Sequence, residues 1–378
     1  MRAPLHRVYF VPGLFGFGRI AGYDYFTHMR QGLEERFAAA GVELICEDVP
    51  APPTSSLRYR ARVLANTVAR TATEGQQGPI HLVGHSTGGL DVRLVLAPHV
   101  DVGGNPDVLR WRSRVVSAVT MNTPHFGTPL AGYFATVSGT RVLYGLSLLT
   151  VVSLTLGEPS LAIFSRLLAG VGGLDELFGG DLKLFGRLTE GVLRFVEREA
   201  REEITEFLSK IRVDQGAIVQ IMPEAMDLFN AVTPNAPAVR YGSVVTGSPP
   251  PRSMRFARRI RSPYAAMTAA VYSTLYQFSS QRPRVYPYAR PTAHELELFR
   301  AAMSYEVNDE SNDGIVPTLS MLRDELLFAG EADHLDVLGH FHDDLEPARH
   351  VDWINSGSRF TRRRFNAMLD AVAKFQLA

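Results

Sequence analysis

The residues best suited to chemistry in this chain are a serine, an aspartate and a histidine on three separate segments. Residues 84–88 read Gly-His-Ser-Thr-Gly, a match to Gly-x-Ser-x-Gly with Ser86 at its centre. A serine hydroxyl is a weak nucleophile at neutral pH, so it needs an imidazole to accept its proton and a carboxylate to orient that imidazole. The pattern therefore predicts covalent acyl-group chemistry at Ser86.

Chain order narrows the choice of the base. Where this motif occurs in a parallel sheet, the serine comes first, then the acid, then a histidine on a loop after a late strand. His334 closely follows residues 325–329, which read as a late strand, and an imidazole suits proton transfer near neutral pH. We predict His334 as the general base. The histidines that lie too early, or that have no strand directly before them, are His81, His85, His125, His340, His342 and His350.

Asp313 is the preferred acid. The dipeptide Asp313–Gly314 is typical of a turn, which directs the carboxylate out of its loop. The second choice is Asp309, and an alternative role for Asp313 is to cap a turn only. The acids that fit a loop after a strand less well are Asp324, Asp333 and Asp336.

The segments on either side of Ser86 fit a strand-to-helix turn. Residues 80–83 form an apolar run that reads as a buried strand, and residues 89–96 read as a helix. Small residues two places before and after the serine let such a turn close without Cβ clashes. The helix N-terminus behind the serine favours negative charge on a reacting oxygen.

A glycine-rich loop supplies the remaining part of the predicted site. Residues 12–18 follow an early strand at residues 8–11, and their spacing fits neither a dinucleotide loop nor a phosphate loop. Such a loop donates one backbone N–H to an oxyanion, and the residue after the nucleophile donates the other. We predict Leu14 and Thr87 as these donors; the alternative is a plain tight turn.

Strands and helices alternate along the chain, which favours an α/β fold with a mostly parallel sheet covered by helices on both faces. The expected strands are residues 8–11, 42–49, 80–83, 115–121, 239–246 and 325–329. The expected helices are residues 25–40, 55–73, 89–96, 199–212, 263–279 and 359–376. We expect residues 1–129 and 236–378 to form the core, with an inserted loop and helix region at 247–305.

Residues 130–235 interrupt this alternation and are mostly helical in propensity. Residues 142–156 and 161–168 are apolar on nearly every side, and such segments need deep burial or an apolar partner. We predict a helical cap over the site, with a lid. The alternative is an ordinary helical subdomain buried against the sheet.

The composition excludes several classes of function. The 39 Lys and Arg residues balance 39 Asp and Glu residues, so no overall field attracts nucleic acid. The single cysteine, Cys46, excludes an internal disulfide and a cysteine-based zinc site. We find no secretory signal and no run of about 18 apolar residues, so we expect a cytoplasmic protein. Peripheral membrane contact and secretion as a processed chain are left open.

Two segments invite a binding interpretation that we do not favour. Residues 252–261 carry several arginines and are read as a solvated loop, with contact to anionic lipid heads as the alternative. Residues 340–344, His-Phe-His-Asp-Asp, are read as a solvated loop rather than a metal cluster.

Five short blocks together resemble the triacylglycerol lipases of the Pseudomonas and Burkholderia type. The blocks are residues 11–26, 82–90, 122–128, 312–316 and 333–336. The resemblance implies an α/β-hydrolase fold with a triad of Ser86, Asp313 and His334, and oxyanion donors at Leu14 and Thr87. It also implies long-chain ester substrates and a lid that opens at lipid surfaces.

Two departures from that family concern the site. The family has a histidine before the oxyanion-loop glycine, where this chain has Pro12, so the support of the loop is unaccounted for. Many family members bind a structural calcium partly through the aspartate two residues after the catalytic histidine, a position held here by Asp336. An upstream partner for Asp336 is not evident. We therefore predict no cofactor and no metal ligand, and leave a structural calcium open.

The sequence thus predicts a serine carboxylic-ester hydrolase of lipase type, acting on lipid or acylglycerol esters through an acyl-enzyme. Alternatives with the same triad are an esterase for shorter esters, a polyester depolymerase and an acyltransferase. Non-enzymatic alternatives are a ligand receptor with this fold and a lipid-surface binding protein. The expected partners are an ester substrate and a lipid surface, without nucleic acid.

Overall fold

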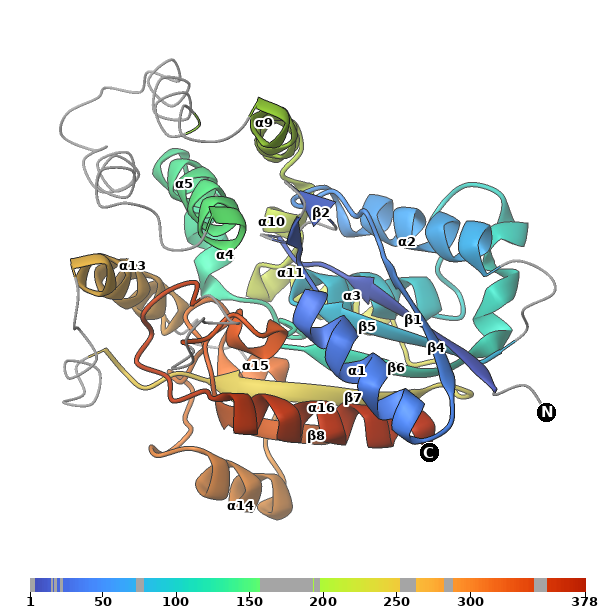
Figure 1. Ribbon diagram of the computed structural model, residues 1–378. Coiled ribbons are helices and arrows are strands. Elements are labelled where there is room, and N and C mark those ends of the chain that lie inside the picture. Colours follow the sequence, from blue (N-terminus) through green and yellow to red (C-terminus); the bar gives the residue numbers. More distant parts are fainter. Residues whose placement is uncertain are drawn as a thin grey trace.

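The computed structural model describes residues 4–14, 16, 19–20, 23–72, 78–156, 193, 198–251, 263–281, 288–342 and 352–378. Its centre is a six-stranded sheet with the strand order β4-β1-β5-β6-β7-β8, in which every neighbouring pair is parallel (Figure 1). The strands are β1 (Leu5–Val11), β4 (Glu43–Asp48), β5 (Ile80–His85), β6 (Val115–Met121), β7 (Arg240–Gly247) and β8 (Glu325–Glu331). A separate antiparallel hairpin joins β2 (Arg19–Ile20) to β3 (Tyr23–Asp24).

The parallel sheet determines where the functional loops meet. Parallel strands all end at the same edge of a sheet, so the loops that follow them gather there. β1 leads into residues 12–18, β5 leads into Ser86, and β8 leads toward His334. The predicted oxyanion loop, nucleophile and base therefore share the carboxyl edge of the sheet.

Helices cover both faces of the sheet, as its buried strands require. On one face α1 (Thr27–Ala39) packs against α16 (Arg362–Leu377), and on the other α2 (Leu57–Thr71) packs against α3 (Thr87–Leu96) (Figure 1). One side of α2 is buried, and it includes the apolar residues Leu57, Ala61, Leu64 and Val68. Gly32 lets α1 approach α16 closely, because a Cβ there would lie 2.3 Å from Leu369 Cδ1.

The predicted elements agree closely with the observed ones where the periodicity is strong. The strand at 115–121 and the helix at 263–279 coincide with β6 and α13 (Pro263–Ser279). β5 continues to His85 and α3 already begins at Thr87, so the turn around Ser86 is tighter than the predicted ranges indicate.

Short elements have no clear signal in the periodicity, and we did not expect them. They are β2, β3, η1 (Pro106–Arg114), α14 (Ala293–Ala302), α15 (Thr318–Met321) and η2 (Asp336–Leu338). α14 does carry a local signal, since Thr292 and Glu295 form a capping box at its start.

Between β6 and β7, every element of the described residues is a helix. These helices are α4 (Pro129–Phe134), α5 (Val137–Leu156), α9 (Arg198–Val213), α10 (Gly216–Gln220) and α11 (Pro223–Val232). The apolar run at 161–168 and the arginine-rich run at 252–261 lie outside the described residues.

α5 is longer than the apolar run that predicts it. It begins at Val137, and in the described part of the chain it is the one helix long and apolar enough to cross a membrane. The search for a run of about 18 apolar residues did not identify this helix, because Arg141 and several Ser, Thr and Gly residues interrupt the run. However, 67% of its most apolar window, Val137–Leu154, is buried inside the protein, and the core helix of a soluble protein has the same composition.

Candidate active site

Residues 84–88 form a sharp turn between β5 and α3. Ser86 has φ 55° and ψ −129°, a backbone conformation that is rare for a residue with a side chain. Strain of this kind occurs at functional sites where the surrounding structure holds it in place. The Ser86 amide donates a hydrogen bond to the Met121 carbonyl at 2.8 Å, which ties the turn to the end of β6.

The two glycines of the motif are required by close packing. A Cβ on Gly84 would lie 2.4 Å from the amide nitrogen of Gly89, and a Cβ on Gly88 would lie 2.0 Å from the Val11 carbonyl oxygen. These clashes involve backbone atoms, which cannot turn aside. The spacing of small residues around Ser86 thus has the physical cause that the sequence pattern implies.

The glycine-rich loop lies directly against Ser86. A Cβ on Gly13 would lie 2.5 Å from Ser86 Cβ and 3.0 Å from Ser86 Oγ. Among the described residues, no atom accepts a hydrogen bond from the amides of Leu14 and Thr87. Two unpaired N–H donors therefore belong to segments that adjoin the serine, which is what an oxyanion hole needs.

Arg60 supports this loop from behind. Its fully buried guanidinium donates a hydrogen bond from Nη2 to the Pro12 carbonyl at 2.5 Å and pairs with Asp91 of α3, with Nε to Oδ2 at 2.9 Å. Burial raises the pKa of Asp91 to about 7, and Arg60 opposes that shift. Arg60 thus ties the predicted oxyanion loop to α3, the helix that follows Ser86, at Pro12, where the sequence left the support of the loop unaccounted for.

The predicted acid and base are in contact. His334 Nδ1 lies 2.6 Å from Asp313 Oδ2, and both side chains are buried. Asp313 Oδ1 accepts hydrogen bonds from the amides of Ile315 at 2.9 Å and Val316 at 2.7 Å. A carboxylate held in this way accepts a hydrogen bond from Nδ1–H, so the proton of the neutral imidazole lies on Nδ1 and its lone pair on Nε2.

His334 Nε2 is the atom that would take the serine proton. It is buried and has no hydrogen-bond partner among the described residues, so the Ser86 hydroxyl is not bonded to it in this structure. Such bonds are often long in free enzymes and shorten when substrate binds. The two segments do meet, since the His85 and His334 ring centroids are 4.8 Å apart.

The alternative acids are placed elsewhere. Among the acidic side chains that the structure describes, only Asp313 is hydrogen-bonded to the His334 imidazole. Asp324 accepts a hydrogen bond from Asn235 Nδ2 at 2.7 Å. Asp333 and Asp336 belong to a separate acidic cluster on the loop that carries His334.

The expectation of a solvated loop at residues 340–344 was wrong for its first two residues. His340 and Phe341 are buried. The His340 Nε2 atom lies 3.4 Å from the Tyr25 carbonyl oxygen, and Phe341 packs against Phe360 and Phe365. Aromatic packing therefore draws the start of this segment into the core, and residues 343–344 lie outside the described part.

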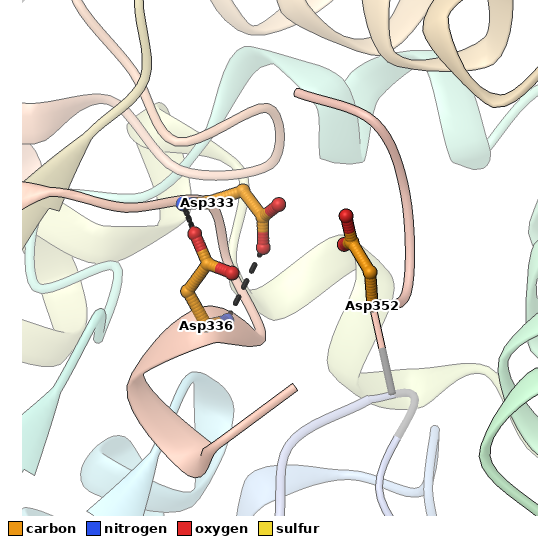
Figure 2. A group of neighbouring side chains, drawn as sticks. All are labelled: Asp333, Asp336 and Asp352. Carbon is orange, nitrogen blue, oxygen red and sulfur yellow. Dashed lines mark hydrogen bonds between the residues drawn. The ribbon is translucent and has the colours of Figure 1, made fainter. Parts of the chain in front are cut away.

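Asp333, Asp336 and Asp352 form an acidic cluster beside the candidate base. One oxygen from each carboxylate lies within 4.8 Å of the other two, and Figure 2 shows the three side chains turned toward a common space. Asp336 Oδ2 accepts hydrogen bonds from the Asp333 amide at 2.8 Å and from the Ser358 hydroxyl at 2.6 Å. Asp333 Oδ2 is buried and has no hydrogen-bond partner among the described residues.

This donor set fits a calcium ion. Calcium prefers oxygen ligands, carboxylates above all, in a flexible arrangement. Burial raises the pKa of Asp333 to about 7 and that of Asp336 well above its usual value, so a nearby cation would relieve the cost of holding both charged. The fit involves Asp333 and Asp352, neither of which the sequence identified as a partner of Asp336.

Comparison with known proteins shows the fold. No protein-family model matches the chain, and no curated protein matches it. EstA from Clostridium botulinum is similar at 15% identity with a TM-score of 0.51, over 99% of this chain and 87% of that chain. Lipase 1 from Pelosinus fermentans is similar at 15% identity with a TM-score of 0.51, over 99% of each chain. The chain has an α/β-hydrolase fold.

On this α/β-hydrolase fold, two polar side chains at the site, Arg60 and His85, have contacts that we did not predict from the sequence. Arg60 lies on the apolar side of a predicted helix, between Leu57 and Ala61, and an arginine there was a usable signal of a buried ion pair. His85 was set aside because it lies too early in the chain to be the base. Its contact with the main chain of His334 depends on tertiary structure alone.

Proposed function

We propose that this chain is a serine carboxylic-ester hydrolase of lipase type. Ser86 is the nucleophile, His334 is the general base and Asp313 orients the imidazole. The observation that carries the proposal is the 2.6 Å contact of His334 Nδ1 with Asp313, on a loop that packs against the strained turn at Ser86. The α/β-hydrolase fold and the resemblance of the five sequence blocks agree with it.

The reaction proceeds in two halves. His334 Nε2 takes the proton of the Ser86 hydroxyl, and Oγ attacks the ester carbonyl. The amides of Leu14 and Thr87 hold the resulting oxyanion, and one such donor is typically worth about 3 kcal/mol. His334 then protonates the departing alcohol, and water hydrolyses the acyl-enzyme by the same route. No organic cofactor enters these steps.

The proposed substrates are lipid or acylglycerol esters. The helices between β6 and β7 bury many apolar side chains, and α9, α10 and α11 also expose large apolar side chains. The exposed side chains are Val213, Val219, Leu228 and Val232. We assign residues 130–235 as the cap of a core formed by residues 1–129 and 236–378, with peripheral contact to a lipid surface through the cap. Lipase 1 from Pelosinus fermentans, by its name, belongs to the same class of enzyme.

A series of p-nitrophenyl esters from short to long acyl chains tests this function. The wild-type chain is expected to hydrolyse the long esters, and Ser86→Ala is expected to reduce kcat by roughly 10⁴-fold or more. Ser113→Ala is the matched control, because Ser113 is an exposed serine just before β6, at the opposite end of the strand from the Ser86 turn. Activity that declines steeply beyond short chains would assign an esterase, and Ser86→Ala with wild-type activity would refute the mechanism.

We also propose that Asp333, Asp336 and Asp352 hold a structural calcium ion. The ion would neutralise the cluster and join the loop after His334 to the segment at Asp352. In a thermal melt, added Ca²⁺ is expected to raise Tm after EDTA treatment, by more than Mg²⁺ does. Asp352→Asn is expected to remove that rise, whereas Asp370→Asn, which changes an exposed aspartate of α16, is expected to keep it. An equal rise in both variants would place any calcium elsewhere.

A further inference from the structure

A chain of hydrogen bonds joins the segments of the site through side chains that the proposed triad does not use. His85 Nε2 lies 2.8 Å from the main-chain oxygen of His334. Tyr25 Oη lies 3.2 Å from His85 Nδ1. His85 directly precedes Ser86, so this chain leads from one end of the nucleophile turn to the backbone of the base.

The direction of each bond follows from the chemistry of the groups. A main-chain carbonyl only accepts, so the proton of His85 lies on Nε2, and Nδ1 accepts from the Tyr25 hydroxyl. Burial lowers the pKa of His85 well below 6.5, so the ring is neutral and carries a single proton. Both ring nitrogens are therefore in use, and His85 has neither a free proton nor a free lone pair for the reaction.

Tyr25 extends the chain to the oxyanion loop. Its ring is buried and lies so close to Gly16 that a Cβ there would be 2.9 Å from Tyr25 Cε1. Its ring also packs edge-on against Phe26, with centroids 5.0 Å apart. The tyrosine is thus fixed on several sides, and one connected set of contacts runs from the oxyanion loop through His85 to His334.

We propose that His85 is a positioning residue for the base: its Nε2–H holds the main-chain carbonyl of His334 and so fixes the distance between His334 Nε2 and Ser86. Among the described residues, the Asp313 contact at Nδ1 is the one hydrogen bond of the His334 imidazole, so the position of the ring also depends on the main chain that carries it. The hydrogen bond from His85 limits the movement of that main chain. Because His85 is the neighbour of Ser86 in the chain, the bond fixes the main chain of His334 relative to the nucleophile. Misplacement of a reacting group by about 1 Å costs on the order of 10²-fold in rate. The inference rests on the proposed ester hydrolysis.

The test compares two substitutions of His85 in the full-length chain. His85→Leu removes the donor and keeps an apolar side chain, whereas His85→Gln places an amide N–H near the position of Nε2. We expect His85→Leu to lower kcat for a p-nitrophenyl ester about 10- to 100-fold with KM within about twofold. His85→Gln is expected to recover part of that loss, and the rate of labelling by a fluorophosphonate should fall and recover in parallel. His99→Leu, the same change at an exposed histidine, is the control.

Several outcomes would overturn the inference. A folded His85→Leu variant with wild-type kcat would refute the inference. An equal loss of kcat in the His85→Leu and His85→Gln variants would also refute it, because it would show that His85 acts through packing alone. If His85→Leu does not fold, Tyr25→Phe decides, because it deletes only the hydroxyl that orients His85. A severalfold fall in kcat at unchanged KM supports the role, and an unchanged kcat refutes it. Wild-type protein without Ser86-dependent hydrolysis would instead refute the proposed function, and this inference with it.

Discussion

At the scale of single residues, the account depends on which nitrogen of His334 carries the proton. Asp313 Oδ1 accepts hydrogen bonds from two backbone amides, and Asp313 Oδ2 faces His334. The orientation of the carboxylate is therefore fixed before any substrate binds. Asp313→Asn would keep the shape of the side chain and present an N–H to Nδ1. The imidazole would then be held in the wrong tautomer, with its proton on Nε2.

We therefore expect Asp313→Asn to reduce kcat about 10⁴-fold while leaving Tm nearly unchanged. Steady-state kinetics with a p-nitrophenyl ester measure the loss. Asp309→Asn, the change at the second-choice acid, is expected to keep wild-type kcat. The reverse pattern, with the loss at position 309, would transfer the role of the acid to Asp309.

At the scale of elements, the site depends on how the oxyanion loop is fixed to α2 and α3. The Arg60–Asp91 pair is completely buried, and Arg60 also satisfies the Pro12 and Pro53 carbonyls. Arg60→Ala would leave the Asp91 carboxylate buried and uncompensated. Breaking a buried pair in this way costs about 3–5 kcal/mol of unfolding free energy.

Urea denaturation measures this loss. Arg58→Ala is the matched control, since the Arg58–Asp101 pair is exposed and its atoms are 3.7 Å apart. Such surface pairs contribute about 0–1 kcal/mol. Losses of similar size in the two variants would show that Arg60 does not anchor the loop.

The sequence predicts elements well where one short sequence pattern indicates both the local structure and the reactive residue. The motif around Ser86 is both a strand-to-helix turn and a reactive site, so residues 80–96 are readable locally. By contrast, the contact of Arg60 with Pro12 and that of His85 with His334 join residues far apart in the chain. The position of Arg60 indicates a buried ion pair, but no local pattern identifies the partners of Arg60 or of His85. The same holds for Asp352, whose contact with the carboxylates of Asp333 and Asp336 depends on tertiary structure alone.

At the scale of the whole molecule, buried histidines link stability to pH. Burial lowers the pKa of His81 to about 3 and holds those of His85 and His125 well below 6.5. A histidine with a lowered pKa binds fewer protons in the folded state than in the unfolded state. Its contribution is therefore complete above pH 6.5 and is lost as the pH falls below that value. Asp48 and Asp91, whose pKa burial raises to about 7, act in the opposite direction.

Because the buried histidines and the buried aspartates change stability in opposite directions, the test compares the pH dependence of the unfolding free energy in two proteins, the wild type and His81→Gln. From pH 6.5 down to pH 5, the unfolding free energy of the wild type should fall relative to that of His81→Gln. The expected change is about 1.4 kcal/mol per pH unit, the value for one proton. Urea denaturation at several pH values measures it, with His99→Gln as a control at an exposed position. Parallel curves for wild type and His81→Gln would contradict the prediction.

The central claim is that the Ser86 hydroxyl is made nucleophilic by His334. Intact-mass spectrometry after treatment with a fluorophosphonate tests it most directly, followed by mapping of the labelled peptide. We predict a single adduct on Ser86 of the wild type, no adduct on Ser86→Ala, and labelling of His334→Ala that is slower by several orders of magnitude. An adduct on another residue, or labelling of the wild type and of His334→Ala at the same rate, would contradict the claim.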